Sequence, residues 1–232
     1  MITTGIELNT FLTDLNAGAA IDLTLGDVLV NTARAVIEEE RPWIVLRKVD
    51  TSLSLTTAST WNTAVSIAGI TDFSRFYSDT PIRLFDGNNQ VHYFNQVPFD
   101  RQLEYKDVSN TFCFDENTDT LYFNGTIPFN GTLHISYIAT GDGIDLESDS
   151  RVWSPFPARF LPLIGFYAIG IFKGAVDYDS INRQMLPENR AALEALKNGL
   201  EKWDNERQLS TMSNNDPSYD SESFRNGAIN RY

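Results

Sequence analysis

Few side chains in this chain have the types and spacing that catalysis or metal binding would need. The two histidines, His92 and His134, and the single cysteine, Cys113, all fall in segments that alternate like β-strands. A nucleophilic cysteine needs an activating base, and a histidine needs carboxylates or further ligands to work in a triad or metal site. The sequence sets no such groups at a recognisable spacing. We therefore expect ordinary sheet positions here, and no catalytic residue, metal site or cofactor.

Two acidic segments are the other candidates for chemistry. Asp177-Tyr178-Asp179 and Asp115-Glu116, with Asp119 nearby, carry the carboxylates that hard cations prefer. A calcium loop also needs a central glycine and a closing glutamate, and both segments lack that spacing. We interpret the first as a break at a helix end and the second as a solvated turn. A hydrolase with paired carboxylates stays open as a third class of function, because sequence alone cannot place two carboxylates in one cleft.

The composition is that of a folded, acidic protein. The 232 residues are 42% hydrophobic and 12% aromatic, with a formal net charge of −13. A nucleic-acid groove needs clustered Lys and Arg to neutralise phosphates, so this charge argues against one. Residues 1–12 lack the basic start and apolar run of a signal peptide, which favours a cytosolic protein. Phe160–Phe172, the longest apolar stretch, falls short of the about 20 residues of a membrane helix, so we expect a buried helix and no membrane contact.

Helical periodicity marks both ends of the chain. Apolar residues three and four apart predict helices over Leu23–Glu40, Ala158–Val176 and Pro187–Leu209. The middle one is apolar nearly all round, which is typical of a central helix. The other two have a single apolar stripe, so we expect the three helices to pack into one bundle. Shorter helices are expected at Glu7–Leu15 and Ser180–Met185.

Between these helices the pattern changes to alternation with β-branched and aromatic residues. Turn signals such as Asn124-Gly125 and Asn130-Gly131 separate the predicted strands. Those strands are Ser52–Leu55, Thr63–Ile67, Ile82–Phe85, Val91–Val97, Phe112–Phe114, Leu121–Phe123 and Leu133–Ile138. Strands at this density favour an inserted antiparallel β-sandwich-like domain.

The predicted fold class is therefore α+β, with a helical bundle built from the N-terminal helix and two long C-terminal helices. This bundle covers 1–50 and 151–209, the inserted β domain covers 51–150, and an extended C-terminal tail covers 210–232. The tail is too polar to build a core, yet apolar residues recur along it, so we expect it to become ordered against a partner. A frayed end without a role is the alternative. The expected anchors at this end are Leu209, Met212, Tyr219, Phe224, Ile229 and Tyr232.

Several short patterns follow one another in a set order from residue 23 to residue 209. They are Leu25-Gly26-Asp27, Ala33-Arg34, Ile37, Trp43–Val49, Val97–Asp100, Leu133–Tyr137, Trp153–Pro157 and the final pair of long helices. This order resembles the head-to-tail adaptor proteins of tailed bacteriophages, also called neck or head-completion proteins. The resemblance consists of segment order and short patterns, without a catalytic signature.

The resemblance implies a structural virion protein and no enzymatic activity. Such adaptors form a homo-oligomeric ring, commonly of twelve copies, beneath the portal of the capsid. The implied partners are further copies of the chain, the portal protein and a tail or nozzle protein. Double-stranded DNA passes through the channel without sequence-specific binding, and the C-terminal extension grips the portal. The implied location is the neck of the virion, assembled in the host cytoplasm.

The acidic charge gains a role under this resemblance, because carboxylates that face the channel would keep DNA phosphates from adhering. Screening restricts the effect to about 8 Å at physiological salt, so only groups facing the channel matter. The candidates are Glu38, Glu39, Glu40, Glu194 and Glu201. A solvated helix face explains each of them equally well.

The aromatic residues of the β segment support an alternative function. Side chains such as Tyr93 and Tyr122 recur along the predicted strands. Aromatic β surfaces stack on sugars, so the alternative is a β-domain binding module, either carbohydrate-binding or associated with a tail fibre. More often such residues form a core and cross-strand pairs.

Overall fold

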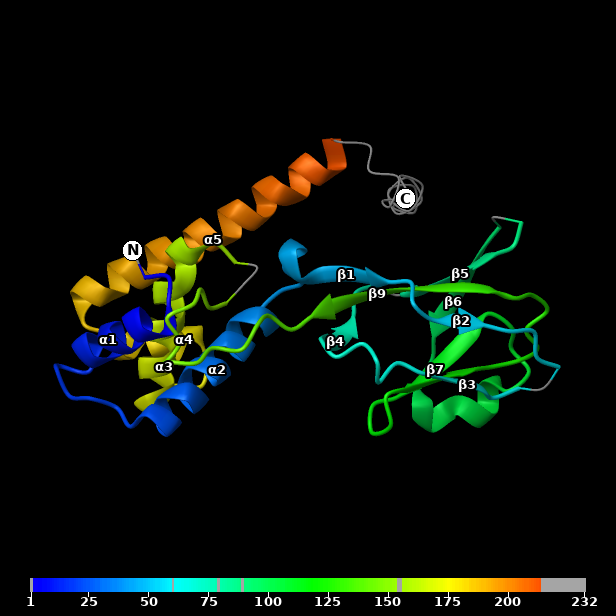
Figure 1. Ribbon diagram of the computed structural model, residues 1–232, viewed down its shortest axis with the longest axis horizontal. Helices are drawn as coiled ribbons and strands as arrows, with labels where there is room; N and C mark the ends of the chain where they lie inside the picture. The colour runs from blue at the N-terminus through cyan, green and yellow to red at the C-terminus, as the bar shows by residue number, and fades with distance from the viewer. Residues whose placement is uncertain (1, 60, 79, 89, 154–155, 214–232) are drawn as a thin grey trace, which may run out of the picture. The chain divides into compact units, whose positions relative to one another are not determined.

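The computed structural model describes residues 2–59, 61–78, 80–88, 90–153 and 156–213, with side chains up to residue 209 (Figure 1). These residues form two compact units. The β unit is the continuous segment Glu38–Gly141, and the helical unit takes the described residues before and after it. The chain thus leaves the helical unit near the end of one helix and returns to it after a single long excursion.

The helical unit is organised around one apolar helix. Its elements are α1 (Gly5–Leu15), α2 (Leu23–Glu39, whose last residues belong to the β unit), the 3₁₀ turn η3 (Ala158–Phe160), α3 (Leu161–Phe172), α4 (Tyr178–Gln184) and α5 (Pro187–Ser213). α3 is buried along most of its length and contacts α1, α4 and α5. An all-round apolar sequence is stable only when covered on most sides, so its central position follows from its composition.

The helix starts are fixed by local hydrogen bonds. Thr4 and Glu7 form a reciprocal capping box at α1, in which the Thr4 hydroxyl accepts from the Glu7 amide at 3.2 Å. At α4 the Asp177 carboxylate accepts from the Ser180 amide at 2.7 Å. Asp22 does the same for α2, accepting from the Leu25 amide at 3.2 Å.

The polar side of α2 binds the segment by which the chain returns from the β unit. The Asn31 side-chain amide donates to the Ile144 carbonyl at 2.7 Å, and its oxygen accepts from the Ile144 amide at 3.0 Å. Asp27 accepts from the Leu146 amide at 2.9 Å. These bonds satisfy backbone groups that would otherwise be buried without partners, since Ile144 and Leu146 are both buried.

The β unit is one mixed sheet. Its elements are η1 (Ile44–Leu46), β1 (Arg47–Asp50), β2 (Ser54–Leu55), β3 (Thr63–Ser66), β4 (Phe73–Phe76), β5 (Ile82–Asp86), β6 (Val91–Gln96), η2 (Phe99–Tyr105), β7 (Thr111–Asp115), β8 (Thr120–Phe123) and β9 (Gly131–Ala139). The order is β1-β9-β5-β6-β7-β8-β3, and β2 and β4 also pair with β9. The β6–β7 pair is parallel, and the other described pairs are antiparallel.

The sheet curls around its own apolar face. Alternate residues of β9 point to this face, and Ile135 lies opposite Ile82, which in turn lies opposite Phe94. Phe112 and Phe123 form the corresponding pair between β7 and β8. The period of two in these strands thus supplies one buried cluster from several neighbouring strands.

The predicted architecture is wrong in its β part. The structure is α+β, but the described strands form a single curled mixed sheet, and among the described residues no second sheet packs on it as a sandwich would require. Two features keep the strands together. β9 is long enough to pair with β1, β2, β4 and β5, and η2 crosses from β6 to the start of β7, which makes that pair parallel.

The predicted three-helix bundle and tail also need correction. The central helix packs on α1, α4 and α5, so the two short helices belong to the core arrangement, while α2 holds the returning segment. The tail was expected to begin at residue 210, but α5 continues to Ser213. Residues 214–232 lie outside the described part of the chain.

Candidate functional site

Most of the predicted anchors at the C-terminal end lie outside the described residues. Leu209 lies on α5 and is exposed. Met212 lies within α5, but its side chain is outside the described part, as are Tyr219, Phe224, Ile229 and Tyr232 in full. The structure therefore places one anchor on the surface and leaves the role of the others as a prediction.

The five predicted channel-facing glutamates belong to different units. Glu38 is only 6% exposed and accepts a hydrogen bond from the Gly141 amide at 3.2 Å, so its carboxylate serves the β unit itself. Glu39 and Glu40 are exposed. On α5, Glu194 is exposed and accepts from the Asn182 side-chain amide at 3.1 Å, whereas Glu201 is half-buried. Glu39, Glu40 and Glu194 are thus the exposed members of this set.

Cys113 has the surroundings of a structural thiol. It is fully buried, with Asn124 Nδ2 at 3.7 Å and the Pro98 carbonyl at 3.8 Å. Burial raises the pKa of the Cys113 thiol, and this outweighs the hydrogen bond from Asn124. A raised pKa keeps the thiol protonated near neutral pH and so disfavours nucleophilic attack.

The two histidines lie against aromatic rings of the β unit. His92 stacks on Phe129 with ring centroids 3.5 Å apart, and its Nε2 lies 3.3 Å from an Asp86 oxygen. His134 lies 4.1 Å from Phe85, and burial together with the charge of Arg83 lowers the pKa of His134. Within the described ranges, no three His, Cys, Asp or Glu side chains gather as metal ligands would.

One concave surface described in the β unit is a groove at one end of the curled sheet. It consists of a cavity of about 610 Å³ that shares Gln96, Phe114 and Glu116 with a neighbouring cavity of about 370 Å³. Phe94 and Gln96 project to the same face of β6, and Phe112 and Phe114 to the same face of β7. The groove therefore continues the buried face of the sheet outward, to where its strands end.

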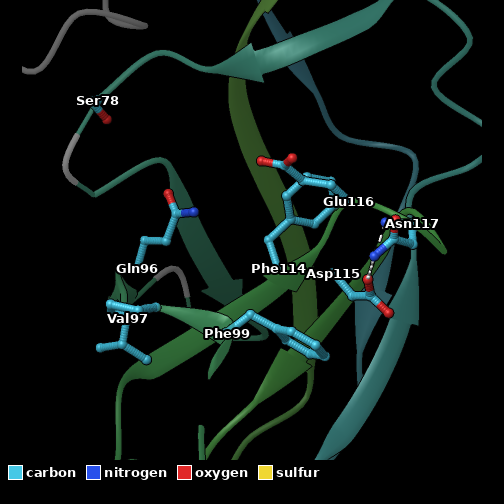
Figure 2. A pocket seen from close by; sticks show the side chains of 9 residues that line it. Ser78, Gln96, Val97, Phe99, Phe114, Asp115, Glu116 and Asn117 are labelled. Atoms are coloured by element: carbon cyan, nitrogen blue, oxygen red, sulfur yellow. Dashed lines mark hydrogen bonds between the residues drawn. The ribbon is translucent and has the colours of Figure 1, made fainter. Parts of the chain in front are cut away.

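Figure 2 shows the arrangement of polar and aromatic side chains in the larger cavity. In this view Gln96 lies across the cavity from Phe114 and Glu116. Asp115 and Asn117, which also line the cavity, are joined by a hydrogen bond of 3.3 Å. The lining thus combines carboxylate, amide and aromatic groups.

A β-bulge supplies the aromatic residues of the smaller cavity. Phe73 and Phe76 are three positions apart and would point to opposite faces of a regular strand, but the register of β4 against β9 shifts between Phe73 and Arg75. Both rings consequently contact Phe114, with centroid distances of 5.6 and 5.2 Å. The three rings pack edge to face and form a firm aromatic wall.

The acidic turn that borders the groove is held by its own hydrogen bonds. Asp115 accepts from the Thr118 hydroxyl at 2.8 Å and from the Asn117 backbone amide at 3.0 Å. The Thr118 hydrogen bond is the main cause that lowers the pKa of Asp115, so this carboxylate is charged at neutral pH. Glu116 makes no described hydrogen bond or ion pair within the residues covered and has its charge available. The segment predicted as a solvated turn is thus also one wall of a cavity.

The groove residues Phe73, Phe76 and Gln96 had not been predicted as part of a site, whereas Phe99 belongs to the aromatic residues behind the alternative of a carbohydrate-binding module. One local signal was present: Phe99 follows Pro98, which ends a strand, so its ring had no partner position in the sheet. The bulge in β4 gave no such signal.

A second kind of surface lies on the helical unit, where aliphatic side chains remain exposed. Leu25 and Val28 lie three apart on the same face of α2, and Val28 is 60% exposed. Val176 and Leu186 flank α4 and are 84% and 60% exposed. We call these the α2 patch and the α4 patch.

Comparisons with known proteins add no identification. No protein-family model matches the chain, and no curated protein does. In the described ranges, no helix combines the length and the apolar character that a membrane span requires. The groove and the exposed patches are therefore the surfaces from which a function is proposed.

Proposed function

We propose that this chain is a structural virion protein, a head-to-tail adaptor. Copies of it form a ring beneath the portal of a tailed bacteriophage, grip the portal with their C-terminal segments, and enclose part of the channel through which DNA leaves. The proposal draws on the order of segments and on the surface of the helical unit. The observation that carries it is the presence of two different aliphatic patches on a unit that has already buried its own core.

The α2 patch is the first of these surfaces. The helix buries Leu29, Val30, Ala33 and Ile37 inside the subunit. Leu25 and Val28 belong to the same predicted apolar stripe, yet the subunit leaves both exposed. A protein interface buries apolar residues of this kind, so we assign Leu25 and Val28 to a contact with a second copy.

The α4 patch differs from the α2 patch in sequence and shape. Val176 follows α3, and Leu186 lies between α4 and α5. α4 is anchored by its Asp177 cap and by Arg190, which donates to the Asn182 carbonyl at 3.0 Å. The two exposed side chains therefore stand at the ends of a firmly held element, as an interface contact needs.

Two unlike patches favour head-to-tail association of copies. An interface that joins different surfaces of two copies repeats indefinitely unless its rotation closes, and closure produces a ring. A ring beneath a portal is such an assembly. The net charge of −13 on each copy also disfavours adhesion of DNA phosphates to the channel wall, in keeping with passage of DNA without binding.

The proposal is tested by assembly on portal rings purified from the same virus. We expect wild-type protein to form rings on the portal in negative-stain images, and Val28→Glu to abolish them, because a buried unpaired charge is strongly unfavourable at an interface. The matched control is Asn198→Glu, which adds the same charge at an exposed position of α5. Normal rings with Val28→Glu, at unchanged thermal stability, would contradict the proposed use of the α2 patch.

A further inference from the structure

The groove of the β unit has a lining suited to a cation. Among the described residues that line it, the larger cavity presents Asp115 and Glu116 and no Lys or Arg, and it also presents the rings of Phe99 and Phe114. Phe99 is 44% exposed, so one face of its ring is accessible. Positive groups bind favourably over aromatic faces, and a carboxylate beside the ring adds a direct charge interaction.

We propose that this groove binds an arginine or lysine side chain presented by an extended segment of a partner protein, with the cation lying near Phe99 and Phe114 against the carboxylate of Glu116. This inference does not rest on the adaptor function, since it concerns a different unit and a different surface. It names a partner chemistry that neither the segment order nor the aliphatic patches suggest.

The charges of the groove favour a cation over other ligands. Asp115 is oriented by Thr118 and Asn117, and Glu116, which lines both cavities with Phe114, makes no described hydrogen bond or ion pair. An anion would meet both carboxylates without a compensating charge in the larger cavity. Arg75 lines the smaller cavity together with Asp119, whereas the described lining at the Phe99 end carries carboxylates and no cation, so we place the cation at the Phe99 end.

The size of the groove favours a chain segment over a free cation. The two cavities of about 610 and 370 Å³ share Gln96, Phe114 and Glu116, and this space is larger than a single free cation needs. The side-chain amides of Gln96 and Asn117 both donate and accept, as the backbone of an extended segment requires. Aromatic and amide groups also suit a saccharide, which makes a neutral oligosaccharide the appropriate competing probe.

The test measures fluorescence anisotropy of full-length protein with the labelled peptide Gly-Ser-Arg-Gly-Ser-Arg-Gly. Its analogue with citrulline in place of arginine keeps the shape and removes the charge. We expect saturable binding of the arginine peptide that weakens as salt increases, and no binding of the citrulline peptide. Glu116→Gln should weaken binding roughly two- to fivefold, as expected for an exposed ion pair. Phe99→Ala should weaken it by about the same factor, through loss of the cation–aromatic contact.

Glu147→Gln serves as the charge-matched control, because Glu147 is an exposed carboxylate of the helical unit. It should leave binding of the arginine peptide unchanged. Equal affinity for the arginine and citrulline peptides would overturn the proposal, and so would equal losses with Glu116→Gln and Glu147→Gln. Binding of maltoheptaose that is lost with Phe99→Ala, without binding of the arginine peptide, would assign the groove to saccharides instead. Ring formation on portals should be unaffected by Glu116→Gln, which separates this proposal from the adaptor function.

Discussion

At the scale of single residues, polar groups that look local in sequence make long-range contacts. Asp27 lies three residues after Thr24, which is the spacing of a helix-capping pair. The structure assigns the cap to Asp22, and Asp27 binds the backbone of Leu146 instead. Capping residues can be recognised from nearby sequence, but a hydrogen bond to a segment over one hundred residues away depends on how the chain folds back.

The Asp72–Tyr137 contact shows how burial and charge interact within the β unit. The Tyr137 hydroxyl donates to Asp72 at 2.9 Å, and Lys48 pairs with the same carboxylate. Burial alone would raise the pKa of Asp72, but hydrogen bonds from Lys48 and Tyr137 outweigh it and lower that pKa. Burial, followed by the hydrogen bond and charge of Asp72, raises the pKa of Tyr137.

We predict that Tyr137→Phe lowers the free energy of unfolding by about 1–2 kcal/mol at neutral pH, through loss of this hydrogen bond. The raised folded-state pKa of Tyr137 means that its contribution is complete below the ordinary tyrosine pKa of about 10 and declines at higher pH. The lowered pKa of Asp72 has its effect at acidic pH. The contribution of the Asp72 carboxylate to folding stability declines as the pH falls through that lowered pKa. The difference in the free energy of unfolding between wild type and Tyr137→Phe should therefore be smaller in strong alkali and in strong acid than at neutral pH.

Urea unfolding at a series of pH values measures this difference. Tyr122→Phe is the control at neutral pH, because the Tyr122 hydroxyl makes no described hydrogen bond within the residues covered. Equal losses of stability for Tyr137→Phe and Tyr122→Phe would show that the bond to Asp72 contributes nothing.

At the scale of elements, the strong sequence periodicity predicted where helices and strands lie along the chain, but it predicted poorly which strands pair with one another. The helical stripes placed α2, α3 and α5 within a few residues of their ends, and the hairpin of β7 and β8 appeared as expected. β1 and β4 were missed because Arg47–Asp50 is charged and Phe73–Phe76 contains a bulge, so neither alternates regularly. Both are recruited by pairing with β9, which is a tertiary interaction and not a local preference.

Two glycines of the helical unit test how closely its helices approach. A Cβ atom at Gly170 of α3 would lie 2.7 Å from the Ile181 side chain on α4, whereas one at Gly199 of α5 would lie 3.4 Å from Phe160. Alanine gains up to about 1 kcal/mol over glycine in a helix interior. We predict that Gly170→Ala loses about 1–3 kcal/mol of stability through overpacking, while Gly199→Ala is neutral or stabilising.

Thermal and urea unfolding of both variants measure these changes in stability. Because both substitutions bring the same gain in helix propensity, a difference between them reports the packing around each glycine. The contact between α3 and α4 also holds the α4 patch in place. Equal stabilisation by both substitutions would mean that α4 yields easily and that the patch beside it is not rigidly presented.

At the scale of the whole molecule, the division into a helical and a β part was predictable from the change in hydrophobic period. The form of the β part was not, because strand order depends on which strands pair with β9 and on the crossover by η2. The groove could not be predicted for the same reason, since it joins residues from β4, β6 and the turn after β7. Leu25 and Val28 of the α2 stripe likewise could not be told from core residues by sequence, and the fold leaves them exposed.

The most direct test of the adaptor function is cryo-electron microscopy of portal rings incubated with the full-length chain and with a chain that ends at Ser213. The shorter chain keeps α5 whole and removes residues 214–232. We predict a continuous ring of the full-length protein on the portal, with its C-terminal segment in density against the portal surface, and no ring with the shorter chain at equal folded stability. A portal that stays bare with the full-length chain would contradict the adaptor function, and normal docking of the shorter chain would contradict the role of the tail.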